Sequence, residues 1–424
     1  MNSWRCLSSS HSSPGRIIKL ETAQRQLTPG ALTGVKVIDL TRVFAGPFSS
    51  QILGDLGADV IKVERYGRGD ESRDYGVDDG EVKPGSPFLT HNRNKRSISL
   101  DLKSPDGKKI LIDLIRDADV LLHNFRPGVM ERLGLAYKDL SEINPRLVFA
   151  SISGFGHTGS MSKRAANDLS IQSFSGLLSI TGHPGGPPTR NPASVADLTA
   201  GMFATMGIMA ALFYRERTGL GQEVSTSMLG GQLAFLNHFL TDFWMNGRLP
   251  EKWGTANRLG LPNEAFPTSD GWVCITSAND DMWKRCASGL GMPEISDDPR
   301  FNLLKSRYAN RAELVRLVSN ATQKMTTDEC VRAMELANVP CVPVNTISDI
   351  ANHEIIEESN ATVDMVVEGD RVAKLVQTPL WLSATPVSAR LSPPRLGEHT
   401  DEILQEIGYK PEQITQLRNG QVIQ

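Results

Sequence analysis

Between residues 35 and 154 the chain alternates between short apolar runs and longer amphipathic stretches. The apolar runs predict buried strands, and they cover residues 35–40, 59–64, 96–102, 119–124 and 146–154. Residues 104–118 predict a helix, because Ser104 suits the N-cap, Pro105 suits the first turn, and an apolar stripe follows. Strands that alternate with helices predict an α/β fold with a doubly wound, mainly parallel sheet.

Basic, amide and glycine residues follow several of these predicted strands. They are residues 41–47, Arg65, Asn124 with the loop to residue 134, and residues 154–159. Open parallel sheets bind ligands beyond the carboxyl ends of their strands, so these residues suit a phosphorylated, nucleotide-like ligand. The chain has neither a GxGxxG nor a Walker A sequence, so neither of the two commonest nucleotide-binding folds is indicated.

The longest apolar run, residues 199–214, consists of small and sulfur-containing side chains that predict a core helix. It is shorter than the roughly 20 residues needed to cross a bilayer, and Arg215 ends it, so we expect no membrane association. Asp197 stands at the start of this helix. By residue type alone, an aspartate in that place is a cap that stabilises the helix by about 1 kcal/mol.

Composition narrows the picture further. The net charge of −3 over 424 residues argues against a generic nucleic-acid-binding protein. The five cysteines form no CxxC pair and the eight histidines no HExxH motif, so we expect a reducing compartment, no disulfide framework and no metal site. Beyond residue 250 the chain becomes turn-rich, and then polar and helical from about 280 to 340, which predicts a smaller second domain.

The N-terminal residues 1–30 differ from the rest of the chain. They are rich in serine, carry several basic residues, and have their first acidic residue at Glu21. This composition resembles mitochondrial transit peptides and predicts a location in the mitochondrial matrix. The alternative is an untargeted, disordered leader on a cytoplasmic protein.

Seven segments in order resemble family III CoA-transferases, the group that holds formyl-CoA transferase, carnitine CoA-transferase and α-methylacyl-CoA racemase. They are VIDLTRVFAGP (37–47), LGADVIKVERYGRGD (56–70), NRNKRSISLDLK (92–103), ADVLLHNFRPGVMERLG (118–134), NPRLVFASISGFGHTG (144–159), ADLTAG (196–201) and LGEHTDEILQEIGY (396–409). The resemblance runs from about residue 34 to residue 422. Within the family, EKWGTANRLGLP (251–262) is most similar to members that transfer CoA from succinyl-CoA to glutarate or hydroxymethylglutarate.

The resemblance implies a chemical role for Asp197, because the aspartate of the ADLTAG position is the family's nucleophile. A carboxylate there attacks an acyl-CoA, forms a mixed anhydride and then an aspartyl-CoA thioester, and passes CoA to a second carboxylic acid. The implied substrates are thus an acyl-CoA and a free carboxylic acid, and no resident cofactor or metal is expected. The role as nucleophile and the role as cap are compatible, since a helix N-terminus favours an ionised carboxylate.

The resemblance also assigns residues that contact the substrates. The positions that match the CoA-binding residues of the family are Phe44, Ala45, Arg65, Lys103, Asn124, Phe125 and Arg132, and a substrate loop contains Gly254, Arg258 and Gly260. Phe44 replaces a glutamine of formyl-CoA transferase, which argues against formyl and oxalyl substrates. Lys252 or Arg258 could pair with the distal carboxylate of a dicarboxylic acceptor of four to six carbons.

Two alternatives remain open at this stage. A racemase of this family needs a proton-transferring histidine beside the aspartate, but Asn167 occupies the matching position and His157 is a poor substitute. A CoA-binding protein without catalytic activity is the other alternative, and the presence of Asp197 argues against it.

The family fold implies a dimer of two chains interlocked like linked rings. Each chain would consist of the leader 1–30, a large CoA-binding domain from 31–220 and 350–424, a linker at 221–249, and a small α+β domain at 250–340.

Overall fold

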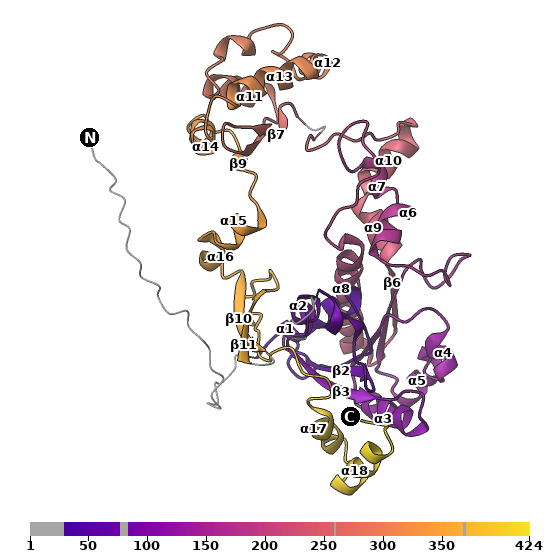
Figure 1. The fold of residues 1–424 in the computed structure, drawn as a ribbon. Helices are drawn as coiled ribbons and strands as arrows, with labels where there is room; N and C mark the ends of the chain where they lie inside the picture. Colours follow the sequence, from indigo (N-terminus) through magenta and orange to yellow (C-terminus); the bar gives the residue numbers. More distant parts are fainter. Residues whose placement is uncertain (1–28, 77–83, 258–259, 368–369) are drawn as a thin grey trace, which may run out of the picture. The chain divides into compact units, whose positions relative to one another are not determined.

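The computed structural model describes residues 29–76, 84–257, 260–367 and 370–424 (Figure 1). The predicted leader 1–30 therefore lies almost wholly outside the described residues. The chain divides into two compact units. Unit 1 contains the residues up to Ile171, Ser194–Phe235 and Glu357–Gln424, and unit 2 contains Gln172–Ala193 and Leu236–Ile356.

A six-stranded parallel sheet forms the centre of unit 1. Its strands are β1 (Lys36–Asp39), β2 (Asp59–Arg65), β3 (Lys95–Leu100), β4 (Val120–His123), β5 (Val148–Ser153) and β6 (Glu223–Ser227), in the order β3-β2-β1-β4-β5-β6. The first five are the strands that the apolar runs predict. From β1 the sheet continues through β2 to β3 on one side, and from β4 it continues through β5 to β6 on the other. The neighbouring strands β1 and β4 therefore define the topological switch point of the sheet.

Two features of this sheet differ from the sequence prediction. The strand β6 has no apolar run, since it pairs only with β5 at the edge of the sheet and none of its residues is fully buried. It lies in the interval 221–249, assigned above to a linker, which also contains α9 (Met228–Phe235) and α10 (Asn237–Asn246). The strand order is that of the dinucleotide-binding fold, although the chain lacks the GxGxxG sequence.

Apolar residues on both faces of the sheet explain why it is wound doubly. Val37 and Ile38 on β1 illustrate the alternation, because Val37 packs in one core and Ile38 in the other. The core around Val37 includes α1 (Ala45–Asp55) and α8 (Val195–Thr218), while the core around Ile38 includes α3 (Pro105–Arg116), α17 (Thr400–Glu406) and α18 (Pro411–Asn419) (Figure 1).

Shorter elements complete unit 1. The helices are α2 (Ser86–His91), α4 (Val129–Leu133), α5 (Tyr137–Ile143) and α6 (Asp168–Phe174), which extends into unit 2, and η1 (Glu71–Asp74) is a 3₁₀ turn. An antiparallel hairpin of β10 (Thr362–Val367) and β11 (Arg371–Val376) packs its apolar face against Leu89 of α2. The C-terminus returns to the central sheet, where Ile423 forms an antiparallel bridge with Leu100.

Unit 2 has the α+β composition that the sequence predicts. An antiparallel sheet of β7 (Asn263–Pro267), β8 (Trp272–Thr276) and β9 (Cys341–Pro343) packs against α11 (Asp280–Gly289), α13 (Arg311–Thr322) and α14 (Thr327–Leu336). The remaining helical segments are α7 (Leu177–Ile180), η2 (Pro293–Ser296), α12 (Leu304–Ala309), α15 (Ile347–Ala351) and α16 (Ile355–Glu358), which reaches into unit 1. Residues 172–193, predicted as part of the large domain, belong to this unit.

The helix α8 extends by about one turn beyond each end of the apolar run 199–214. Among the described residues it alone is long and apolar enough to cross a membrane, by length and composition only. A core helix of a globular protein meets the same criteria, and half of the apolar window of α8 is buried within the fold. Its other face exposes Met206 and Phe213, which are 62% and 61% accessible.

The buried His91 predicts how the stability of unit 1 depends on pH. Burial and the nearby charges of Lys95 and Arg93 lower the pKa of His91 to about 4. In the unfolded chain its pKa is about 6.5, so between these values only the unfolded state binds the proton and the folded state loses stability as the pH falls.

We therefore expect the variant His91→Gln to lose about 2 kcal/mol less unfolding free energy than the wild type between pH 7 and pH 5. Urea titrations followed by circular dichroism at the two pH values measure this difference. The exposed His353 provides a control, because His353→Gln makes the same substitution at a position outside the packed interior. Equal pH dependence in His91→Gln and wild type would contradict the expectation.

Candidate functional site

The loops that follow β1 and β4 meet at the switch point of the sheet and line a cavity of about 450 Å³. Its walls come from the carboxyl ends of β1 to β4 and the segments behind them. The polar and charged lining residues are Thr41, Arg42, Lys62, Glu64, Arg65, Asp70, Asp101, Lys103 and Arg126. We call this space the basic cavity, because its exposed charged side chains include Arg65, Lys103 and Arg126.

Three of the seven predicted CoA-binding residues line the basic cavity. Arg65 ends β2 and Lys103 follows β3, and both are exposed, so neither is needed for the core. Phe125 follows β4 and packs its ring 5.4 Å from the guanidinium of Arg42. Arg132, on α4, lines neither this cavity nor the one described next, and its guanidinium lies beside Gly128. Its role stays a prediction.

A second cavity, of about 390 Å³, contains Asp197 and is called the aspartate cavity below. The predicted residues Phe44, Ala45, Asn124 and Phe125 line it together with Asp197. Both cavities are lined by Arg42, Phe125 and Arg126. The fold of unit 1 therefore brings the predicted nucleophile and a basic, nucleotide-sized space to the same set of loops.

Asp197 is not the N-cap of its helix. Ser194 occupies that position, α8 begins at Val195, and Asp197 lies in the first turn, partly accessible to solvent. Instead, the buried Asp168 serves this helix end from outside, since its Oδ1 accepts a hydrogen bond of 2.9 Å from the backbone N–H of Ala196. Asp168 also lines the aspartate cavity, so two carboxylates face it at the start of α8.

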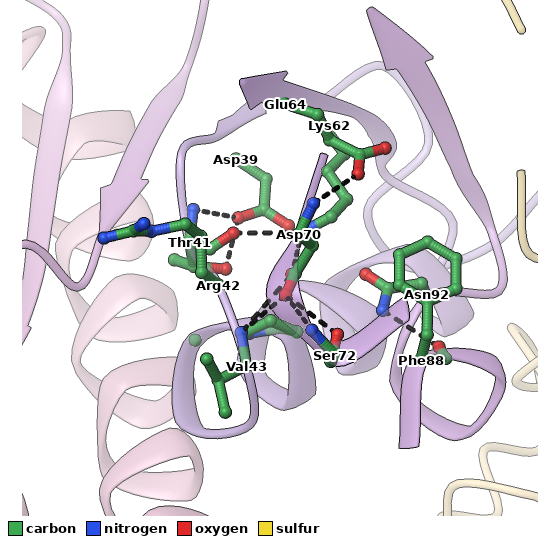
Figure 2. A network of polar contacts seen from close by, with 12 residues as sticks. Asp39, Thr41, Arg42, Val43, Lys62, Glu64, Asp70, Ser72, Phe88 and Asn92 are labelled. Atoms are coloured by element: carbon green, nitrogen blue, oxygen red, sulfur yellow. Dashed lines mark hydrogen bonds and ion pairs between the residues drawn. The ribbon is translucent and has the colours of Figure 1, made fainter. Parts of the chain in front are cut away.

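The loop after β1 is held by side chains from three other segments, of which those of Lys62 and Asp70 are drawn in Figure 2. Asn124 accepts a hydrogen bond from the backbone N–H of Arg42 at 3.0 Å and donates one to its carbonyl at 2.7 Å. Lys62 donates to the carbonyl of Thr41 at 2.9 Å, and Asp70 accepts from the N–H of Val43. Asn124, predicted to bind CoA, thus also fixes the loop that carries Phe44 and Ala45.

Buried charges support this loop from below. Lys62 and Asp70 are completely buried as side chains and form an ion pair of 2.9 Å. Burial alone would raise the pKa of Asp70, but the charge of Lys62 and hydrogen bonds from Lys62, Ser72 and Val43 hold it well below its usual range. Burial likewise opposes the charged form of Lys62, yet Asp70, Asp39 and Glu64 raise its pKa. Both groups therefore stay ionised at neutral pH.

Sequence reasoning missed Arg126, Asp168 and Asp70. Arg126 directly follows the predicted Phe125 and lines both cavities. Asp168 lies beside Asn167, which was considered only as a replaced histidine. Asp70 stands within a quoted segment, but its contact with Val43 joins residues 27 positions apart, a contact that no local pattern reveals.

The predicted substrate-loop residues belong to unit 2. Gly254 lines a cavity there with His238, Asp242 and Arg248 among others. Gly260 is buried, and a Cβ at this position would lie 2.6 Å from the carbonyl of Ser277, so close packing requires glycine. Arg258 lies outside the described residues. The substrate role of these three residues stays a prediction.

Lys252, considered above as a partner for a carboxylate, donates hydrogen bonds to the carbonyls of Gly186 and Pro187. Its ammonium group is therefore already used to fix a neighbouring loop of unit 2. Among the described residues, no group of three or more His, Cys, Asp or Glu side chains is arranged to hold a metal ion.

Comparisons with known proteins identify the family of the chain. The family model described as CoA-transferase family III matches residues 32–400. The chain is 35% identical over 395 residues to the human succinyl-CoA:glutarate CoA-transferase, covering 92% of the chain and 90% of that enzyme. It is 41% identical over 324 residues to the acetyl-CoA:oxalate CoA-transferase of Acetobacter aceti, covering 76% of the chain and 83% of that enzyme.

A crystal structure of a CaiB/BaiF family protein from Brucella suis has a similar fold, with a TM-score of 0.81 at 32% identity, covering 89% of this chain and all of that one. The predicted family and the α/β fold class are thereby confirmed.

The basic cavity generates a test of ligand binding. We expect Arg65→Ala to weaken CoA binding about tenfold, because a charge-assisted hydrogen bond to phosphate is lost at an exposed position. Isothermal titration with CoA measures the effect. Arg68→Ala is a matched control, since Arg68 is also exposed near the end of β2 but does not line the cavity. Equal affinity losses in both variants would show that Arg65 acts only through general charge.

Proposed function

Because the chain belongs to CoA-transferase family III, we propose that it moves CoA from succinyl-CoA to a free dicarboxylic acid such as glutarate or hydroxymethylglutarate. The observation that carries this proposal is the aspartate cavity, in which Asp197 lies with Phe44, Ala45 and Asn124 next to a basic cavity of shared lining. A nucleotide end and a reactive end of one long thioester substrate would occupy the two cavities.

In the proposed reaction the carboxylate of Asp197 attacks the thioester carbonyl of succinyl-CoA. The C–S bond breaks, which leaves a succinyl-aspartyl anhydride and CoA thiolate. The thiolate then attacks the aspartyl carbonyl of the anhydride and releases succinate, so that CoA is held as an aspartyl thioester. The energy of the thioester is retained in each step.

The second half of the reaction reverses these steps with the acceptor. A carboxylate of the acceptor displaces CoA thiolate from the aspartyl thioester and forms a new anhydride. The thiolate attacks the acceptor carbonyl, which yields acceptor-CoA and regenerates the Asp197 carboxylate. No proton, water molecule or electron is exchanged overall, so the proposed reaction needs no resident cofactor.

The first turn of α8 suits a carboxylate nucleophile. The positive end of the helix dipole favours the ionised form of a carboxylate by typically 0.3–1 kcal/mol. Asp168 engages the N–H of Ala196, one residue before Asp197, and so fixes the direction in which the first turn starts.

A dicarboxylic acceptor is supported by the relatives and by one charge. The human and Acetobacter enzymes are named for glutarate and oxalate, and both of these are dicarboxylates. Arg164 lines the aspartate cavity, is exposed, and pairs with no carboxylate among the described residues. With Lys252 engaged by carbonyls, Arg164 is the better candidate to receive the distal carboxylate. The expectation from Phe44 that oxalyl substrates are not used stays a prediction.

The racemase alternative receives little support from the site. Asn167 lines the aspartate cavity, and no histidine does so among the described residues. His157 is bonded instead to the hydroxyl of Ser151 at 2.9 Å.

Two further proposals concern assembly and location. The exposed apolar side chains of α8, and of α10 with Trp244 and Met245 at 73% and 76% accessibility, support a homodimer, because single-chain exposure of this kind is unfavourable in water. The proposed matrix location depends on the composition of residues 1–30 alone, and the cytoplasmic alternative stays open.

We expect Asp197→Asn to abolish CoA transfer, with kcat reduced at least about 1,000-fold, while CoA binding is nearly unchanged. The amide has the same size but cannot attack a thioester as a carboxylate does. Transfer from succinyl-CoA to glutarate, followed by chromatography of the two thioesters, measures the loss. Asp117→Asn changes an exposed carboxylate elsewhere in unit 1 and should remain fully active. More than a few per cent of residual turnover in Asp197→Asn would remove Asp197 from this role.

The diacid proposal is tested with acceptors of equal chain length. We expect kcat/KM for glutarate to exceed that for valerate about 100-fold, since only glutarate has a second carboxylate that can form charge-assisted hydrogen bonds with Arg164. Arg164→Ala should reduce this preference to below about tenfold, whereas Lys163→Ala, an exposed neighbour that does not line the cavity, should not. Equal kcat/KM for the two acceptors in the wild type would refute the diacid class.

A further inference from the structure

Val43 has a backbone conformation that its side chain disfavours. Its φ angle is 71°, in the left-handed region. The other non-glycine residues with positive φ in the described part of the chain are Asn94, Asn338, Asn360, Asp370 and Gln421. Among these Val43 alone is β-branched, and β-branched residues are the least suited to this region. A residue keeps such a conformation only when its surroundings hold it there.

Asp70 is the group that holds Val43. Its two carboxylate oxygens lie 3.1 and 3.3 Å from the backbone nitrogen of Val43, which donates to both (Figure 2). The same carboxylate accepts from Lys62 Nζ at 2.9 Å, from the N–H of Ser72 at 2.9 Å and from its hydroxyl at 2.8 Å. With the side chain of Asp70 fully buried, no water competes for these donors.

The residues before Val43 are fixed in the same way. Asp39 accepts from the N–H of Thr41 at 2.8 Å, and Lys62 and Asn124 hold the carbonyl of Thr41 and both polar groups of the Arg42 backbone. The loop thus enters Val43 in a single direction. The contact between Asp70 and Val43 decides in which direction it leaves.

The segment that leaves Val43 forms a wall of the aspartate cavity. Phe44 and Ala45 line it together with Asp197, and α1 begins at Ala45. No side chain caps this helix at Phe44, so the start of α1 is oriented by the preceding loop and by packing alone. Asp70 itself does not line the aspartate cavity. Asp70 lines the basic cavity and caps η1, whose Glu71 lines the aspartate cavity, but its direct hydrogen bond to the loop that carries Phe44 and Ala45 is the one from the backbone N–H of Val43.

We propose that Asp70 is a positioning residue for the transfer reaction, which holds the strained Val43 so that the backbone of Phe44 and Ala45 is aligned with Asp197. This proposal rests on the proposed function, in which Asp197 is the nucleophile. The strained conformation of Val43 is retained because it sets the direction of Phe44 and Ala45, which line the aspartate cavity and which no side-chain cap fixes.

The test compares single and double variants in the succinyl-CoA to glutarate assay. Asp70→Asn replaces one of the two acceptor oxygens by an amide NH2, which cannot accept from Lys62 or Val43, so the hold on Val43 is weakened. We expect kcat to fall at least about tenfold while KM for succinyl-CoA changes less than about threefold, because the wall of the aspartate cavity is misaligned, whereas Arg65, Lys103 and Arg126 of the basic cavity are unchanged. Ser72→Ala, which removes only the hydroxyl bond to Asp70, should stay within about twofold of the wild type.

The decisive variant adds Val43→Gly to Asp70→Asn. Glycine adopts a positive φ without strain, so the loop no longer needs Asp70 to retain its direction. Lys62 loses its buried partner in both variants, so the comparison isolates the effect of Val43, and we expect the double variant to recover most of kcat. If the double variant regains the wild-type melting temperature but not the wild-type kcat, Asp70 contributes to stability only, and the proposal is overturned.

The remaining outcomes are also decisive. Unchanged kcat in a folded Asp70→Asn would overturn the proposal, and so would an insoluble double variant, since Asp70 would then be required for folding irrespective of Val43. The proposed function is judged separately, by transfer activity in the wild type and its loss in Asp197→Asn. If the wild type transfers CoA and Asp70→Asn has the same kcat, the positioning role of Asp70 is refuted while the proposed function stands.

Discussion

The buried ion pair between Lys62 and Asp70 is the interaction on which the arrangement of the site depends. Two charges removed from water are costly, and their mutual attraction compensates only when the remaining donors and acceptors are also satisfied. Here Lys62 also donates to the carbonyl of Thr41, and Asp70 also accepts a hydrogen bond from the backbone N–H of Val43. The buried charges are therefore satisfied only when the loop after β1 follows one path. Apolar contacts, which have no direction, could not specify that path so closely.

The topology explains why this loop matters. It follows β1, beside the loop that follows β4, at the switch point where ligands bind in open α/β sheets. Asn124 joins the two loops, and Phe125 and Arg126 continue from it along both cavities. The nucleotide end and the reacting end of a CoA thioester would thus be held by two adjacent loops, each anchored in the sheet.

Sequence alone predicted the parts of the fold that depend on local pattern. Five strands of the sheet and the helix α3 follow from apolar runs, a cap and a proline, while β6 was missed because a half-exposed edge strand has no such run. The dinucleotide-type strand order was not foreseen, since topology is independent of the phosphate-binding sequence that usually accompanies it. For the site, motif resemblance indicated Asp197. The supporting roles of Asp168 and Asp70 depend on contacts between segments distant in the chain, which no local pattern encodes.

The central claim is that Asp197 carries CoA covalently during turnover. The most direct measurement is to incubate the full chain with succinyl-CoA, add hydroxylamine, and locate the modified carboxylate by peptide mass spectrometry. The account predicts a hydroxamate at Asp197 that forms only when succinyl-CoA is present. A protein that transfers CoA to glutarate but yields no hydroxamate at Asp197, or yields it at another carboxylate such as Asp168, would contradict the account.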